Sequence, residues 1–445
     1  MAGVAATLAS VAALLTAPVA LAADGSGVGI HTEGTRLVEA DGTELVLRGI
    51  SHAHTWYASQ TRAFADISDA GANAVRVVLS DGTRWTRNGA DDVAAVIDRC
   101  WDEQLVCVLE DHDTTGYGEE GAASTLATAA DYWVSLLPVL AGTEDHVIIN
   151  LGNEPYGNDA ATNERWADDT IAAIQRLRTA GFEHTILVDA PNWGQDWAGI
   201  MKRDAAQVAA ADPQGDVVFS VHMYGVYDTA AEVRDYLDAF IAAGLPLVVG
   251  EFGFDHSDGN PDEDTIMSYT RAQGIGWFAW SWSGNGGGVE YLDMVTSFDP
   301  AQRTSWGTRV ITGPDGLAQT SVRAAVFGGG DTGDGDGDDG DGDGDGDGDD
   351  GGTEEPTGAC TAVPRVSNTW QGGYQAEVVV TAAAAIGGWT VSLGVTPTQI
   401  WGAALTGQTA SNESWNGSVG AGTSTTFGFL GSGTPPAAGT VPCAA

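Results

Sequence analysis

Two glutamates that follow apolar, strand-like runs could together cleave a glycosidic bond. Glu154 lies in residues 150–155 (NLGNEP) and Glu251 in residues 248–253 (VVGEFG), each where the chain leaves the run. Two carboxylates that face each other across a cleft are what hydrolysis of a glycosidic bond requires. The two segments therefore predict a glycosidase site, provided that the fold brings the two strand ends to one place.

A repeating pattern between residues 24 and 327 supplies the elements that could do this. Short apolar runs alternate with helix-like stretches, and several of these stretches end in Gly just before the next run. The runs are residues 45–50, 73–79, 105–110, 146–151, 184–189, 217–222, 246–251 and 274–280. Continuous apolar strands indicate burial on both faces. Eight strand–helix units predict an α/β fold, a (β/α)8 TIM barrel, with the active site at the carboxyl ends of its strands.

Polar and aromatic residues stand at or near the ends of most of these runs. They are Arg76, His112, Asn153, Glu154, His222, Tyr224, Glu251 and Trp280. One such residue could be a satisfied polar group at the rim, but eight in register favour a site. Arg76 lies inside its run, where a buried guanidinium needs an anionic partner.

This ordered set resembles glycoside hydrolase family 5, in the clan whose retaining enzymes carry the acid/base on strand four and the nucleophile on strand seven. The likeness covers residues 24–327. Within the family it is nearest to secreted bacterial endo-β-1,4-mannanases, on the basis of residues 51–57 (SHAHTWY), 109–118 (LEDHDTTGYG) and 280–286 (WSWSGNG).

The resemblance implies a role for each carboxylate, and the roles agree with the chemistry. Glu154 would be the general acid/base, which requires a raised pKa near neutral pH. Glu251 would be the nucleophile and must stay ionised, with Arg76 and Tyr224 supporting its charge. We expect retention of anomeric configuration and a carboxyl separation of about 5–5.5 Å.

Other residues would hold the sugar. Asn153 is expected to bind the 2-hydroxyl at the cleaved unit, while His112 and His222 orient the carboxylates and bind hydroxyls. Trp280 offers an apolar face for a pyranose ring. Further sugar contacts are expected from Trp56, Trp193, Trp282 and Asn285; for the three Trp a place in the core or rim is an equal alternative.

The last part of the chain changes character. Residues 358–445 are rich in Gly, Thr, Ser, Val and Trp, nearly without charge, and predict an all-β sandwich. They resemble the family 2 carbohydrate-binding module. That likeness implies an exposed strip of Trp370, Trp401 and Trp415 that stacks on crystalline polysaccharide, and a buried Trp389.

Composition suggests the remaining boundaries. Residues 1–23 read as a secretory signal peptide, residues 24–328 as the catalytic domain and residues 329–357 as a flexible linker. Within that linker, residues 331–351 contain eleven Asp and no cation. The formal net charge of -43 argues against nucleic acid or an anionic membrane as partner.

The four cysteines fit an oxidising compartment. Cys360 and Cys443 bracket the C-terminal module and are expected to pair. Cys100 and Cys107 either pair or remain buried thiols. No cofactor or metal is expected, although the acidic residues 255–264 could hold a structural calcium ion, with a solvated loop as the favoured alternative.

Together these observations predict a secreted, monomeric endo-β-1,4-mannanase, tethered to cellulose or another crystalline polysaccharide by its C-terminal module. An endo-β-1,4-glucanase on the same barrel is the first alternative. A wall-binding protein without catalysis is more remote, because both glutamates and their supporting set are intact.

Overall fold

The computed structural model describes residues 29–328, 360–370, 372–382, 384–413, 416–417, 419–420, 424–433 and 441–444. The predicted signal peptide and linker lie outside these residues. The chain divides into two compact units, Met1–Asp336 and Gly337–Ala445, and the division falls inside the predicted linker.

The first unit is a closed barrel of eight parallel strands, in the order β10-β11-β4-β5-β6-β7-β8-β9. The strands are β4 (Arg48–His52), β5 (Ala74–Leu79), β6 (Val106–Asp111), β7 (Val147–Asn150), β8 (Ile186–Asp189), β9 (Val217–Met223), β10 (Leu247–Phe252) and β11 (Gly276–Ala279). The predicted TIM barrel is confirmed.

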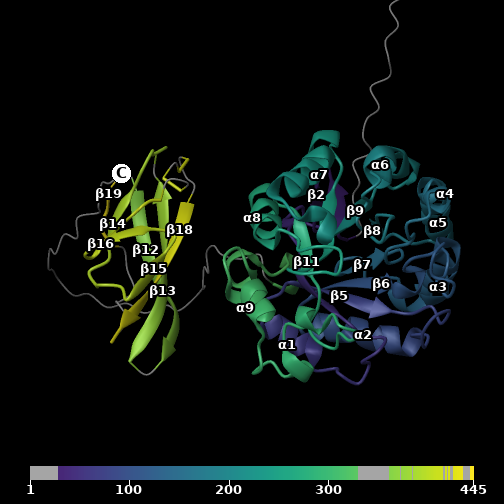
Figure 1. Cartoon of the computed structure of the whole chain (residues 1–445), viewed down its shortest axis with the longest axis horizontal. Coiled ribbons are helices and arrows are strands. Elements are labelled where there is room, and N and C mark those ends of the chain that lie inside the picture. Colours follow the sequence, from purple (N-terminus) through teal and green to yellow (C-terminus); the bar gives the residue numbers. More distant parts are fainter. Residues whose placement is uncertain are drawn as a thin grey trace, which may run out of the picture. The chain divides into compact units, whose positions relative to one another are not determined.

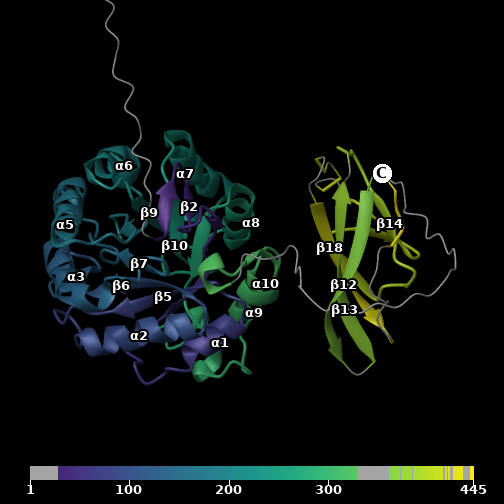
Figure 2. The same cartoon turned by 180° about the vertical axis from the view of Figure 1, so that it is seen from behind.

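Helices surround these strands (Figures 1 and 2). They are α1 (Ala63–Asp69), α2 (Ala90–Asp102), α3 (Leu126–Leu140), α4 (Ala160–Asn163), α5 (Trp166–Ala180), α6 (Ile200–Ala211), α7 (Ala230–Ala243), α8 (Glu263–Gln273), α9 (Ser305–Thr312) and α10 (Leu317–Thr320). A short 3₁₀ turn, η1 (His112–Thr114), follows β6 directly. Within the described residues, none of the helices is both long and apolar enough to cross a membrane.

Helix α7 illustrates how local sequence places a site strand. Its N-terminus is a capping box, in which Thr229 and Glu232 each accept a bond from the other's backbone N–H. Its end is Gly244 at φ 69°, a left-handed conformation that favours glycine. Strand β10, which carries Glu251, begins three residues later, so the helix end sets where that strand enters the barrel.

The strand residues alternate between two cores. On β6, Val106 and Val108 pack in the barrel interior, whereas Cys107 and Leu109 pack against the helices. The amino end of the interior is filled by apolar residues from a small antiparallel sheet and its flanks: Ile30, Leu37, Leu45 and Leu47. That sheet comprises β1 (His31–Glu33), β2 (Arg36–Val38) and β3 (Glu44–Leu45). The predicted run 45–50 is therefore wrong as one strand, since Leu45 ends β3 and the barrel strand begins at Arg48.

The second unit consists of two four-stranded sheets, β12-β13-β18-β15 and β16-β17-β14-β19, with antiparallel pairing. The strands are β12 (Cys360–Trp370), β13 (Gly373–Ala382), β14 (Thr390–Ser392), β15 (Gln399–Trp401), β16 (Ala404–Thr406), β17 (Thr409–Ser411), β18 (Ser424–Ser432) and β19 (Cys443–Ala444). The predicted all-β module is confirmed.

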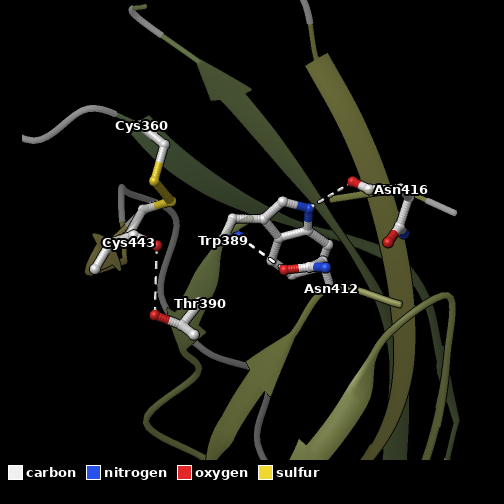
Figure 3. Close-up of a disulfide and its surroundings, with 7 residues drawn as sticks. Cys360, Trp389, Thr390, Asn412, Asn416 and Cys443 are labelled. Carbon is white, nitrogen blue, oxygen red and sulfur yellow. Dashed lines mark hydrogen bonds between the residues drawn. A yellow bond between two sulfur atoms is a disulfide. The ribbon is translucent and has the colours of Figure 1, made fainter. Parts of the chain in front are cut away.

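Trp389 lies in the core of this module, as predicted. Its side chain is 2% exposed and stacks on Phe427, with ring centroids 5.1 Å apart. Its indole N–H donates to the backbone carbonyl of Asn416 at 2.9 Å (Figure 3). The buried indole therefore has both a packed face and a hydrogen-bond acceptor.

Both pairs of cysteines form disulfides. Cys360 at the start of β12 bonds to Cys443 in β19, which joins the two ends of the module (Figure 3). Cys100 in α2 bonds to Cys107 in β6, so the pairing left open by the sequence is present in the structure.

Removing the module's disulfide by Cys360→Ser with Cys443→Ser should destabilise the second unit alone. The bond joins residues 83 apart, and opening a loop of that size costs about 4 kcal/mol in the free energy of unfolding. Differential scanning calorimetry should place the loss in the transition of the module. Cys100→Ser with Cys107→Ser, which opens a loop of seven, is the matched control and should lower the barrel transition instead. An unchanged module transition would contradict the prediction.

Candidate active site

The polar residues of the site continue the inward-facing rows of side chains that form the barrel core. A step of two residues along a strand keeps a side chain on the same face. That step leads from Ala74 to Arg76, Val108 to Glu110, Ile148 to Asn150, Leu187 to Asp189 and Phe278 to Trp280. Because the strands are parallel, these side chains meet at the carboxyl end of the barrel.

Glu251 reaches the interior through an irregularity of β10. Val248 packs in the interior, so a regular strand would point Gly250 inward and Glu251 outward. The pairing of β10 with β9 shifts register between Val249 and Glu251. A Cβ at Gly250 would lie 2.1 Å from the Ser220 hydroxyl. Glycine at this position therefore permits the close approach, and the shift turns the Glu251 carboxylate toward the site.

Arg76 is the hub that orders the interior polar groups. Its Nη1 donates to Glu251 Oε1 at 2.7 Å and its Nη2 to Asn153 Oδ1 at 2.7 Å. Its Nε donates to Asn150 Oδ1 at 3.0 Å. One rigid guanidinium thus fixes groups from β7, β10 and the segment after β7.

Arg76 is entirely buried and is compensated by carboxylates. Glu251, Asp189 and Glu110 lie 2.7, 3.3 and 3.6 Å from its nitrogens. Burial alone would lower the pKa of Arg76, but the charges of Glu110, Glu251 and Asp189 raise it above its usual range. The anionic partner that a buried Arg requires is therefore a set of three carboxylates.

The second oxygen of Glu251 accepts a hydrogen bond from the Tyr224 hydroxyl at 2.9 Å. Burial raises the pKa of Glu251, and the charges of His222 and Arg76 act against that rise. Burial also raises the pKa of Tyr224 well above its usual value, so its hydroxyl stays a donor. Both oxygens of Glu251 thus have a donor that stabilises the ionised form.

Glu154 stands just beyond β7 with φ 39°, in the left-handed region that non-glycine residues seldom occupy. Its backbone N–H donates to Asp189 Oδ2 at 3.3 Å. Its carboxylate Oε1 lies 2.8 Å from His222 Nδ1, and Glu251 Oε2 lies 3.6 Å from the same nitrogen. One oxygen of each glutamate and a nitrogen of His222 all lie within 4.8 Å of one another.

His222 is positively charged and lies among these carboxylates. Its Nε2 lies 3.2 Å from Asp189 Oδ2. Burial lowers the pKa of the imidazole, but the charges of Glu251 and Asp189 and the contact with Glu154 raise it to about 10. His222 is therefore an imidazolium at neutral pH, and it offsets part of the negative charge of the site.

Aromatic residues surround His112 at the same site. The ring of His112 is held by Glu110, with Nδ1 2.9 Å from Oε1, and stacks on Trp280 with centroids 5.9 Å apart. Trp56 meets His112 edge-on at 5.1 Å. The indole N–H of Trp280 donates to Asn285 Oδ1 at 2.8 Å, so Asn285 positions the indole.

A cavity of about 480 Å³ opens beside Glu154 and Tyr224. Trp193 and Trp197 lie in its wall. The indole N–H of Trp193 donates to Glu119 Oε2 at 3.0 Å, which holds the ring in place. Aromatic faces and carboxylates at the edge of one cavity suit a carbohydrate ligand.

A cellulase-family model, glycosyl hydrolase family 5, matches residues 38–286, more than half of the chain. The chain belongs to glycosyl hydrolase family 5. It is 56% identical over 318 residues to a mannan endo-1,4-beta-mannosidase of Streptomyces lividans. The match covers 71% of this chain and 82% of that relative. A second model, of a cellulose binding domain, matches residues 360–444.

Solved structures of beta-mannanases are also similar to this chain. The beta-mannanase of Thermomonospora fusca has a TM-score of 0.67 at 60% identity, covering 67% of this chain and 99% of that chain. The mannohexaose complex of the same mannanase has a TM-score of 0.66 at 58% identity, with the same coverage.

Sequence reasoning missed three buried residues of this family 5 site: Glu110, Asn150 and Asp189. All three contact Arg76. Each lies two residues after an apolar residue that points inward, but which residues of a short run point inward is known only from the structure. Trp197 was also missed; its only signal was proximity in sequence to Trp193.

The expected sugar contact of Trp282 is wrong. Its side chain is 1% exposed and packs in the core between strands and helices, so it presents no face to a sugar. Trp56, by contrast, is exposed, and Trp193 is half-buried in the cavity wall.

Of the three predicted strip residues, Trp401 is the one whose side chain lies within the described part of the chain. Trp401 on β15 is 37% exposed and pairs across the sheet with Gly428 of β18. A Cβ at Gly428 would lie 2.4 Å from the Trp401 ring, so the indole lies against bare backbone. Trp370 ends β12, but its side chain, like the whole of Trp415, lies outside the described residues.

Within the described residues, two groups bring three potential metal-ligand atoms within 4.8 Å of one another. One is Glu154, His222 and Glu251; the other is Asp81, Asp111 and Asp113. Neither lies in residues 255–264, so the calcium ion considered for that loop gains no support.

His222 should remain protonated well above the ordinary pKa of histidine, about 6.5. Because its folded pKa is about 10, its contribution to the free energy of unfolding is fully present below about pH 6.5 and is lost as pH rises toward 10. In ¹⁵N-histidine-labelled protein, the resonances missing from His222→Gln should keep imidazolium shifts at pH 8. The unfolding free energy of wild type should also fall more steeply than that of His222→Gln between pH 7 and 10. Resonances that titrate near pH 6.5 would refute this.

Proposed function

We propose that this chain is a retaining endo-β-1,4-mannanase that cleaves internal bonds of mannan-type polysaccharide. The observation that carries the proposal is the pairing of Glu154 and Glu251, with oxygens within 4.8 Å, at the strand ends of a family 5 barrel. Inverting hydrolases hold their carboxyl groups about 6.5–9.5 Å apart to admit a water molecule, whereas retaining ones need about 5–5.5 Å. The short separation favours double displacement.

In the first step, Glu154 gives its proton to the glycosidic oxygen while Glu251 attacks the anomeric carbon. The bond to the leaving sugar breaks, the leaving oxygen keeps the proton, and a glycosyl ester forms on Glu251. Arg76 and Tyr224 hold the two oxygens of Glu251 at 2.7 and 2.9 Å, so the nucleophile is oriented before substrate arrives.

In the second step, the Glu154 carboxylate takes a proton from water as that water attacks the anomeric carbon. The ester breaks, Glu251 leaves as carboxylate and the sugar keeps its original configuration. His222 contacts both glutamates and is positively charged, so it stabilises the single carboxylate of the pair in each state, Glu251 before the ester forms and Glu154 after it.

Asn153 is placed to bind the 2-hydroxyl of the sugar at the cleaved bond. Its amide oxygen accepts from Arg76 at 2.7 Å and its amide nitrogen donates to Thr115 Oγ1 at 2.9 Å. These contacts fix the amide, which leaves its second N–H for substrate. The face of the Trp280 indole, which Asn285 positions, stacks on the pyranose ring of that same sugar.

Mannan is favoured as substrate because the chain is 56% identical to a mannan endo-1,4-beta-mannosidase over most of that relative. We expect strong reducing-sugar release from galactomannan, weak release from carboxymethylcellulose, and a loss of at least about 1,000-fold in Glu251→Ala. Glu164→Gln, an exposed carboxyl paired with Arg203 on the surface, is the matched control and should keep full activity. Release mainly from carboxymethylcellulose would make the protein an endo-β-1,4-glucanase, and activity retained by Glu251→Ala would overturn the mechanism.

The second unit would hold the enzyme on cellulose or another crystalline polysaccharide, as a secreted monomer. Support comes from the match to the cellulose binding domain model, the exposed Trp401 and the two disulfides, which suit an oxidising compartment. Binding of an insoluble surface by one unit raises the local concentration of substrate for the other.

Trp401→Ala should weaken adsorption of the full chain to microcrystalline cellulose by about 10-fold, because a pyranose ring loses the flat apolar indole face. The kcat/KM on soluble galactomannan should not change. Thr406→Ala, an exposed truncation on the neighbouring strand β16, serves as control in the same depletion assay. Unchanged adsorption of Trp401→Ala would remove Trp401 from the binding surface.

A further inference from the structure

Three aspartates bring buried carboxylates together on the outer side of β6. Asp111 ends this strand and, one residue after the inward Glu110, belongs to its outward row. Asp113 lies in the following turn, and Asp81 follows the neighbouring strand β5. All three are buried, and one oxygen of each lies within 4.8 Å of the others.

Each aspartate spends one carboxylate oxygen on backbone donors. Asp113 Oδ2 accepts N–H groups of Gly82, Thr83 and Arg84 at 3.1, 2.8 and 2.9 Å. Asp81 Oδ1 accepts from the Thr83 N–H at 2.6 Å, and Asp111 Oδ1 from the Asp81 N–H at 3.1 Å. The loop after β5 is therefore folded around the cluster.

The other oxygen of each aspartate has no partner. Asp81 Oδ2, Asp111 Oδ2 and Asp113 Oδ1 are buried and make no hydrogen bond within the described residues. Nor does any ion pair in that part of the chain involve these carboxylates: Arg87 donates to the backbone carbonyl of Asp81 instead, at 2.7 Å. Buried carboxylates without a cation or donor are costly.

Ser124 points to the same place from a different segment. Its side chain is 4% exposed and its hydroxyl makes no hydrogen bond. The hydroxyl lies close to the Asp81 carboxylate and lowers its pKa. The cluster thus includes a fourth buried oxygen, the Ser124 hydroxyl. Because this group is neutral, repulsion between carboxylates does not explain why it lacks a hydrogen-bond partner.

We propose that Asp81, Asp111, Asp113 and Ser124 bind a calcium ion. Calcium takes six to eight oxygen ligands at about 2.3–2.6 Å, so its ligand oxygens lie up to about 5 Å apart, which matches the cluster. The ligand set contains only oxygen, which suits a hard cation rather than zinc or copper. Water completes the coordination, and the site is distinct from residues 255–264.

The bound ion would stabilise the turn that supports the catalytic side of the barrel. The Asp111 carbonyl accepts the Asn153 N–H at 2.9 Å, and Thr114 Oγ1 donates to the Asn153 carbonyl. His112 lies between two of the ligands. A cation here ties the loop after β5 to the segments that carry His112 and Asn153, and its role is structural.

The test uses the full chain, depleted of metal with EDTA and returned to chelator-free buffer, with CaCl₂ as the probe. Calorimetry should show the Tm of the barrel transition rise by about 5 °C at saturating calcium. In Asp113→Asn, the amide oxygen can keep the backbone donors while the NH₂ group faces the other carboxylates. That variant should lose the calcium response, and in EDTA its Tm should not fall below that of wild type.

Asp258→Asn, in the acidic loop of residues 255–264, is the matched control and should respond as wild type does. An equal response of wild type and Asp113→Asn, or no response of wild type, would overturn the proposal; the latter would mean that the cluster is neutralised by protons. Should Asp113→Asn fail to fold, Ser124→Ala keeps all three carboxylates. Its calcium affinity, measured by isothermal titration, should fall several-fold, and an unchanged affinity would contradict the site.

Discussion

The buried guanidinium of Arg76 is the contact on which the site depends. It bonds Glu251, Asn153 and Asn150 and lies within ion-pair distance of Asp189 and Glu110. A cation in this position lets a barrel interior hold several carboxylates that would otherwise be protonated or displaced. Its rigid, planar donors also set directions, so the nucleophile and the sugar-binding amide are oriented by one group.

The barrel contributes a second constraint, which is alternation along each strand. Along a strand, the inward side chains change from apolar, as in Val108, to polar, as in Glu110, within one step of two residues. On β6 an outward residue also has a role, because Asp111 is one of the buried aspartates that we propose to bind calcium. A single strand end therefore supports the catalytic network on one side and a structural site on the other.

Much of this could be predicted from the sequence. Continuous apolar runs indicated parallel strands buried on both faces, and eight strand–helix units in about 300 residues are typical of a barrel. Arg76 was recognised because an Arg inside an apolar run must be paired. The C-terminal module and its buried Trp389 followed from a resemblance.

What could not be predicted depends on local geometry. The register shift at Gly250, which turns Glu251 inward, leaves no mark in hydrophobic pattern. Glu110 and Asp189 were overlooked because the inward parity of a short run is ambiguous until its neighbours are known. For Trp282 the sequence left a sugar contact and a place in the core or rim as equal alternatives. The three short strands β1 to β3 fall below the length at which a period can be recognised.

In the proposed mechanism, Arg76 and Tyr224 present Glu251 as a nucleophile opposite Glu154. The most direct measurement is mass spectrometry of the protein after reaction with a 2-deoxy-2-fluoro-β-mannosyl donor that carries a fluoride leaving group. Because Glu251 is the nucleophile in this mechanism, we expect one glycosyl adduct, on the peptide that contains Glu251. An adduct on Glu154, or turnover with inversion and no adduct, would contradict it.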